Sequence, residues 1–152
     1  MYHRVNKFQD ALKCFSKVLL NIKNDKTVYI ARGIVYADMG NHQLAINDFN
    51  DAISHDKELA EGYYRAGMSK YSLKRFKEAI EDFKTANNKE DAQIDDDNTM
   101  TRNPGIECGL AQCYHSLREY EKAMDYYMNA LEMDPKNTNF LMSRAQCYYD
   151  QK

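Results

Sequence analysis

The fold is decided by residues 45–86, which read AINDFNDAISHDKELAEGYYRAGMSKYSLKRFKEAIEDFKTA. In this stretch an alanine is followed four residues later by phenylalanine and three residues further on by a second alanine, and the triplet recurs after 34 residues. Spacings of four and seven residues place the three side chains on one face of a helix. The triplets of the chain are Ala11, Phe15 and Val18; Ala45, Phe49 and Ala52; Ala79, Phe83 and Ala86; and Ala123, Tyr127 and Ala130. The chain is therefore predicted to repeat one helical unit.

A second, earlier helix is predicted in each unit. Gly33 and Gly67 precede the first alanines of their units by twelve residues, and Tyr36 follows Gly33 by three. A small residue at this place lets two antiparallel helices pack with their backbones close together. Gly40-Asn41 supplies a tight turn between the two helices of its unit, whereas Lys74-Arg75 occupies the same turn without glycine.

The period, the alanine and aromatic positions and the closing Met133-Asp134-Pro135 resemble the tetratricopeptide repeat, a helix-turn-helix unit of 34 residues. The resemblance implies an all-α fold, a right-handed tetratricopeptide-type αα solenoid of stacked hairpins. Lys70 and Lys57 depart from it, at the places of the first-helix tyrosine and of the closing proline. The predicted units are the second half of a repeat at 1–25, whole repeats at 26–59, 60–87 and 104–137, an insertion at 88–103, and the first helix of a further repeat at 138–152.

The insertion follows from the spacing of the triplets, because the step from Ala79 to Ala123 is ten residues longer than the period. The segment 88–103 is rich in carboxylates and holds few apolar side chains, so it cannot bury enough surface to offset its ordering entropy. A mobile acidic loop is predicted, and a solvated spacer is favoured over a loop in which Thr99 and Thr101 accept phosphate. Asn103-Pro104 is predicted to begin the next helix.

Composition limits the classes of partner and location. The 152 residues carry 21 basic and 23 acidic side chains, a net charge of -2, so no excess positive field attracts a nucleic acid. No apolar run approaches the roughly 20 residues that span a bilayer, and the start of the chain lacks the apolar region of a signal peptide. Four irregularly spaced cysteines do not form a disulfide framework. A cytoplasmic protein without membrane contact is predicted, and the resemblance leaves a cytoskeletal or ciliary place open.

No catalytic, metal or cofactor site is predicted. Ser54, His55 and Asp56 are adjacent, but consecutive residues of a helix point in different directions and cannot relay a proton. The histidines share no spacing with the cysteines that would bring metal ligands to one point, and no glycine-rich phosphate loop is present. Cys113 and Cys147 occupy one repeat position and are interpreted as substitutes for a small apolar residue. The chain is therefore not expected to be an enzyme or to bind a small-molecule substrate.

The resemblance places a concave groove along the first helices, where members of the family hold a peptide or a helix of a partner protein. The preferred hypothesis is a scaffold or adaptor whose groove binds an apolar or amphipathic segment within a multiprotein assembly, with Tyr64, Met68 and Tyr71 as anchors. The predicted groove residues are Ile30, Ile34, Tyr64, Met68, Tyr71, Gln112, His115, Met142 and Tyr149. Tyr64 and Tyr71 are seven residues apart, a spacing that is equally typical of a helix core. The alternative is a structural spacer in a long array with no ligand of its own.

A co-chaperone role is less favoured. Members that hold the acidic C-terminal tails of heat-shock chaperones carry Lys, Asn and Arg at set groove positions, which clamp a carboxylate. This sequence has Ile30, Ile34, Tyr64 and Met68 at those positions. A chaperone-tail peptide is therefore predicted not to bind.

Both ends of the chain carry apolar faces that need neighbours. The first unit, in which Tyr2 corresponds to Tyr36, lacks most of its first helix. The last helix has apolar and aromatic side chains at Phe140, Leu141, Met142, Tyr148 and Tyr149. We expect the natural protein to continue as a larger array, with neighbouring repeats of the same parent chain as further partners.

Overall fold

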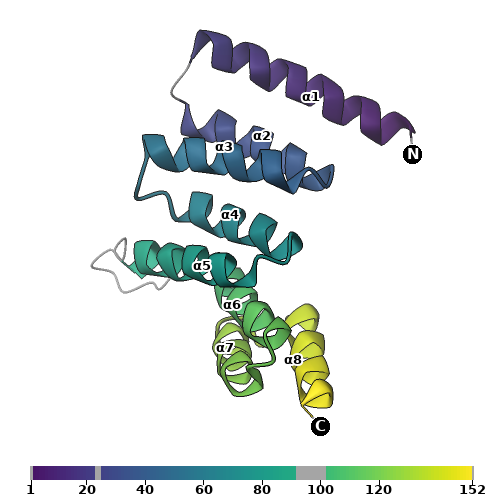
Figure 1. Ribbon diagram of the computed structural model, residues 1–152, viewed down its shortest axis with the longest axis vertical. Helices are drawn as coiled ribbons and strands as arrows, with labels where there is room; N and C mark the ends of the chain where they lie inside the picture. Colours follow the sequence, from purple (N-terminus) through teal and green to yellow (C-terminus); the bar gives the residue numbers. More distant parts are fainter. Residues whose placement is uncertain (1, 23–24, 92–101, 152) are drawn as a thin grey trace.

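The structure is a stack of antiparallel helical hairpins (Figure 1). The computed structural model describes residues 2–22, 25–91 and 102–151, and all regular structure in these ranges is α-helix. Each helix packs on the next one along the chain, from α1 at one end of the long axis to α7 and α8 at the other. The helices are α1 (Tyr2–Asn21), α2 (Lys26–Asp38), α3 (His42–His55), α4 (Ala60–Ser72), α5 (Phe76–Asp91), α6 (Pro104–Ser116), α7 (Tyr120–Met133) and α8 (Thr138–Asp150). Within the same ranges, none of them is both long and apolar enough to cross a membrane.

Short polar side chains begin three of the first helices. Asp25, Asn103 and Asn137 each accept a hydrogen bond from the backbone amide two residues later, at 2.9, 2.8 and 3.1 Å. These bonds satisfy amide groups that have no acceptor inside the helix. Pro104 occupies the first turn of α6, which confirms the helix start predicted at Asn103-Pro104.

The three hairpin turns share one backbone geometry. Gly40, Lys74 and Arg118 have φ angles of 80°, 60° and 62°, and each lies two residues beyond the end of the first helix of its hairpin. Glycine adopts this left-handed conformation freely, whereas lysine and arginine are strained in it. The packing of the two helices therefore imposes the turn even where the sequence has no glycine.

Close packing around small residues forms the core of each hairpin. Ala45, Ala79 and Ala123 on the second helices are fully buried. A Cβ atom at Gly33 would lie 2.5 Å from Cε1 of Phe49, so any larger side chain there would have to displace this ring. The close approach predicted from the spacing of glycine and aromatic residues is confirmed.

Phe83 joins the hairpins on either side of the insertion. A Cβ at Gly67 of α4 would lie 2.9 Å from Cε1 of this ring, and a Cβ at Gly109 of α6 would lie 2.6 Å from its Cζ. The ring therefore packs against two first helices at once. The contact between α5 and α6 is as close as a contact within one hairpin.

The predicted loop at 88–103 is wrong at its beginning, because α5 continues to Asp91. Three side chains in this last turn have partners on other elements. Asn87 donates to Glu107 at 3.0 Å, Lys89 donates to Glu58 at 2.7 Å, and Glu90 accepts from the backbone amide of Asn103 at 2.8 Å. These contacts offset the conformational entropy that is lost when the last turn of α5 becomes ordered. The acidic composition alone was not expected to offset that loss. Residues 92–101, with Thr99 and Thr101, lie outside the described residues.

The first element is a single helix. In the repeat register, residues 5–7 correspond to the turn at 39–41. The backbone there is instead helical, and α1 is one continuous helix of 20 residues. The first unit consequently contributes a single long helix that packs on α2.

Candidate protein-binding groove

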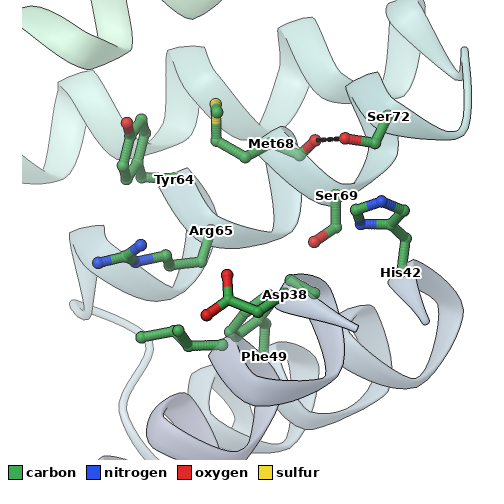
Figure 2. A pocket seen from close by; sticks show the side chains of 10 residues that line it. Asp38, His42, Phe49, Tyr64, Arg65, Met68, Ser69 and Ser72 are labelled. Carbon is green, nitrogen blue, oxygen red and sulfur yellow. Dashed lines mark hydrogen bonds between the residues drawn. The ribbon is translucent and has the colours of Figure 1, made fainter. Parts of the chain in front are cut away.

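A pocket lies between the first helices of two neighbouring units. It has a volume of about 230 Å³, and it is formed by α2, by α3 and by α4 (Figure 2). Its lining consists of Ile34, Ala37, Asp38, His42, Phe49, Tyr64, Arg65, Met68, Ser69 and Ser72. We call it the α2–α4 pocket.

The α2–α4 pocket combines apolar and polar walls. Tyr64 and Met68 lie side by side on α4, and the Met68 side chain is 39% exposed (Figure 2). Ser69 of α4 faces His42 of α3, whose Nδ1 atom is buried and has no hydrogen-bond partner among the described residues. A segment bound here would meet apolar surface beside hydrogen-bonding groups, which is the usual composition of a binding pocket.

Tyr64 is held in place from two sides. Its ring packs on Phe83 with the centroids 6.1 Å apart, and the Arg65 guanidinium lies 5.9 Å from its centroid. Burial raises the pKa of the Tyr64 hydroxyl above its ordinary value, so the group stays protonated further into the alkaline range. Arg65 is itself paired with Glu61 at 3.3 Å. Tyr64 therefore offers a rigid aromatic surface that loses little entropy on binding.

A second pocket, of about 520 Å³, lies where α4, α6 and α8 end. We call it the α6–α8 pocket, and its lining consists of Tyr71, His115, Ser116, Arg118, Tyr120 and Asp150. His115 Nε2 lies 2.9 Å from Asp150 Oδ2, which connects α6 to α8. The Tyr71 ring packs on Phe76 at 5.5 Å. The exposed wall of this pocket is mostly polar, whereas that of the α2–α4 pocket is mostly apolar.

The structure brings together five of the nine predicted groove residues. Ile34, Tyr64 and Met68 line the α2–α4 pocket, and Tyr71 and His115 line the α6–α8 pocket. The remaining four are placed differently.

Ile30 corrects the prediction, because it is only 7% exposed and belongs to the buried cluster around Phe49. A partner cannot reach it. Gln112, Met142 and Tyr149 line neither of the two pockets, and the latter two are strongly exposed on α8.

Several pocket residues were not predicted. His42 begins a second helix, Arg65 follows a predicted groove position directly, and Arg118 and Tyr120 belong to a turn and the helix after it. The prediction considered only fixed positions of the first helices, so it could not include them. The missed signal was the hairpin turn, which brings the start of each second helix to the end of the groove.

The side chains that resemble catalytic groups have structural contacts. Ser54 donates to the Asp51 carbonyl at 2.7 Å, the His55 ring stacks on Tyr29 at 5.6 Å, and Asp56 binds Lys26 at 2.5 Å. Among the described residues, no three His, Cys, Asp or Glu side chains are grouped as metal ligands.

Stacked helical hairpins with a groove along their first helices define an αα solenoid. Family models described as "Tetratricopeptide repeat" match residues 30–93 and 106–137, which together are more than half of the chain. The chain belongs to the tetratricopeptide repeat family, as the resemblance predicted. Repeats of this family are typically non-catalytic modules of protein interaction.

Curated relatives share the repeats over part of their own length. Tetratricopeptide repeat protein 6 of Homo sapiens is 28% identical over 142 residues, 91% of this chain and 25% of that protein. Serine/threonine-protein phosphatase 5 of Homo sapiens is 27% identical over 84 residues, 55% of this chain and 17% of that protein, and the match covers its repeat region only. Hsp70-Hsp90 organizing protein 3 of Arabidopsis thaliana is 22% identical over 146 residues, 96% of this chain and 18% of that protein. The chain spans a quarter or less of the length of these relatives.

Solved structures share the fold. MamA has a TM-score of 0.81 at 21% identity, with 98% of this chain and 81% of that chain covered. YrrB, a TPR protein with an unusual peptide-binding site, has a TM-score of 0.73 at 20% identity, with coverage of 90% and 66%. The first TPR of Spaghetti (RPAP3), bound to the HSP90 peptide SRMEEVD, has a TM-score of 0.71 at 17% identity, with coverage of 82% and 91%. These likenesses identify an all-α tetratricopeptide solenoid.

Proposed function

We propose that this chain is a non-catalytic adaptor within a multiprotein assembly, and that its groove binds an apolar or amphipathic segment of a partner protein. The observation that carries the proposal is the α2–α4 pocket, in which Tyr64 and Met68 lie side by side at the surface. A peptide-bound relative of the same fold supports a peptide or helix as the occupant. The net charge of -2 favours a protein over a nucleic acid, and we propose a cytoplasmic location without membrane contact.

The size of the pocket supports this class of partner. Its volume of about 230 Å³ lies below the roughly 300–1,000 Å³ of typical small-molecule sites. It suits one or two side chains of a longer segment, whose remainder would continue along the first helices towards Tyr71 and the α6–α8 pocket. The flexible thioether of Met68 adapts to the shape of the occupant, while Tyr64 is already fixed.

The test is a selection of peptides of about 12 residues on the wild-type chain, followed by calorimetric titration of a selected peptide. Met68→Arg places a charge on the apolar wall and is expected to weaken binding by at least about tenfold. Met128→Arg is the matched control, because Met128 on α7 is similarly exposed, at 48%, and lines neither pocket. Equal affinities of the two variants would contradict the groove proposal and favour the structural spacer.

The groove is not expected to hold the acidic tail of a chaperone. Ile34, Tyr64 and Met68 offer no cation to a terminal carboxylate, and the Arg65 guanidinium is paired with Glu61. Asp38 adds a negative charge to the pocket. Calorimetry with the peptide SRMEEVD should show no binding at about 100 μM, and micromolar affinity would overturn this prediction.

A further inference from the structure

One wall of the α2–α4 pocket carries polar groups without a partner. Ser69 of α4 is only 2% exposed, and its hydroxyl makes no hydrogen bond to any described residue. It faces His42, whose buried Nδ1 atom is equally unpaired among these residues (Figure 2). The neighbouring Ser72, by contrast, donates to the Met68 carbonyl at 3.1 Å. Because buried polar groups are normally hydrogen-bonded, a polar group of a bound segment would supply the partner that Ser69 lacks.

The fixed charges around the α2–α4 pocket favour a cation. Asp38, the last residue of α2, lines the pocket, is exposed, and has no ion pair with a described residue. Arg65 is the one guanidinium or ammonium group in the lining, and Glu61 already binds it at 3.3 Å. Two carboxylates therefore accompany one cation, and the surplus charge is negative. A cationic group of a partner is attracted to Asp38, whereas an anionic group is repelled.

The remaining lining of the pocket suits an apolar stem. Ile34 and Ala37 of α2, and Tyr64 and Met68 of α4, line the same pocket as Asp38. A lysine side chain combines a stem of methylene groups with a charged tip, and it commonly lays the stem along apolar surface. The volume of about 230 Å³ admits one long side chain of this kind.

We infer that the α2–α4 pocket holds a lysine side chain of the partner segment, with the ammonium group between the Asp38 carboxylate and the Ser69 hydroxyl. The inference rests on the proposed function and adds the chemistry of the anchoring residue. Both oxygens accept hydrogen bonds, and the three donors of an ammonium turn freely about the stem, so they reach acceptors on two helices. The donors of an arginine are fixed in one plane.

Other side chains fit this pocket less well. A carboxylate or phosphate on the partner meets the negative charge of Asp38. A purely apolar side chain fills the space beside Tyr64 and Met68 but leaves the buried Ser69 hydroxyl unpaired. Lysine combines the apolar stem with the cation that the pocket lacks.

The test compares two peptides on three forms of the chain by calorimetric titration. The first peptide is the tightest binder selected from a library of peptides of about 12 residues, and the second has norleucine in place of its lysine. Asp38→Asn removes the charge at nearly constant shape, and because Asp38 is exposed and unpaired among the described residues, folding is preserved and is checked by circular dichroism. Asp51→Asn is the matched control, since Asp51 on α3 is also exposed, changes the net charge equally and lines neither pocket.

The expected result is a preference for lysine that depends on Asp38. The ratio of the two affinities, lysine peptide over norleucine peptide, should fall by about threefold to tenfold in Asp38→Asn and stay as in the wild type in Asp51→Asn. Comparing ratios removes the gain in apolar contact that norleucine itself brings.

The possible failures are distinguishable. Selected peptides that share no lysine, or one ratio in all three forms of the chain, would overturn the inference. The proposed function would still hold in that case if Met68→Arg weakens binding of the same peptides. A ratio that falls equally in Asp51→Asn would show general attraction of charge and would also overturn the inference. Selection of no peptide at all would overturn both the inference and the groove proposal.

Discussion

Lys74 and Arg118 adopt the left-handed backbone conformation that Gly40 adopts in the first hairpin. Because a side chain is strained there, Lys74→Gly and Arg118→Gly are each expected to raise the free energy of unfolding by about 0.5–1 kcal/mol. Gly40→Ala is the reciprocal control, since no atom lies within 4 Å of the added Cβ, and it should lower the value by about 1 kcal/mol. Urea denaturation measures all three, and destabilisation by both glycine substitutions would show that the turns are not strained.

Two buried cysteines are expected to make the folded state less stable at alkaline pH. Burial raises the pKa of Cys113 to about 12 and that of Cys108 to about 11, from 9.0. The unfolded chain ionises these thiols near their ordinary pKa, so the folded state loses stability as pH rises above about 9, by up to about 1.4 kcal/mol per pH unit and thiol. Cys113→Ala should reduce this slope in urea denaturation between about pH 8 and 10.5. An unchanged slope would show that the Cys113 thiol does not contribute.

At single positions, the sequence predicts which repeat position a residue occupies better than it predicts how exposed the side chain is. Cys113 and Cys147 are fully buried, as expected for substitutes of a small apolar residue. Ile30 and Tyr64 occupy the same repeat position, yet the first is buried and the second lines a pocket. Their exposure depends on the neighbouring helix, which one position of one repeat does not describe.

At the scale of helices, the place of the first-helix tyrosine is filled in different ways. Tyr114 of α6 stacks on Tyr126 of α7, with centroids 5.4 Å apart and ring planes 4° apart. Lys70 holds the equivalent place of α4 and binds Asp82 of α5 at 2.5 Å. The carboxylate of Asp82 therefore supplies a partner for Lys70 across the hairpin, and the equivalent position of α3 is also an aspartate, Asp48.

The Lys70–Asp82 pair is expected to add little net stability. Burial raises the pKa of the Asp82 carboxyl although Lys70 lowers it, so desolvation outweighs the attraction. Asp82→Ala should cost about 3 kcal/mol because it leaves the Lys70 side chain, only 13% exposed, without its partner. Lys70→Tyr/Asp82→Tyr, which copies the pair of the next hairpin, should stay within about 1 kcal/mol of wild type. Urea denaturation gives the free energy of unfolding of each variant. A double variant as unstable as Asp82→Ala would contradict the prediction.

The helix boundaries show why composition alone misplaced the insertion. Glu107 is buried and accepts hydrogen bonds from Asn87 of α5 and Asn129 of α7. Nothing in the local sequence of α5 signals this contact, since Glu107 lies 20 residues from Asn87 and 22 residues from Asn129. The hairpins themselves follow from local spacing, and the extent of α5 follows from long-range polar contacts.

For the whole molecule, the period predicted the stack because each unit contacts mainly its neighbours. The prediction of the groove was less complete than that of the stack. Its pockets include His42, Arg118 and Tyr120, which come from turns and second helices. The shape between two units depends on how hairpins are stacked, and one sequence contains no direct signal of that geometry.

The junction at the insertion is expected to be strong, and the outer helices are expected to open first. One buried cluster extends from Ala79 of α5 to Cys147 of α8, and Phe83 fills the contact between α4, α5 and α6. In a stack, each unit is stabilised by its neighbours, and end units have fewer of them. Amide hydrogen exchange of the dilute chain should therefore be slowest in α4–α7 and faster in α1 and α8. Gly109→Leu, which displaces the Phe83 ring at a cost of roughly 2 kcal/mol or more, should let α6–α8 exchange separately from α4–α5. If α6–α8 already exchange as a separate block in the wild type, Phe83 does not couple the two halves of the array.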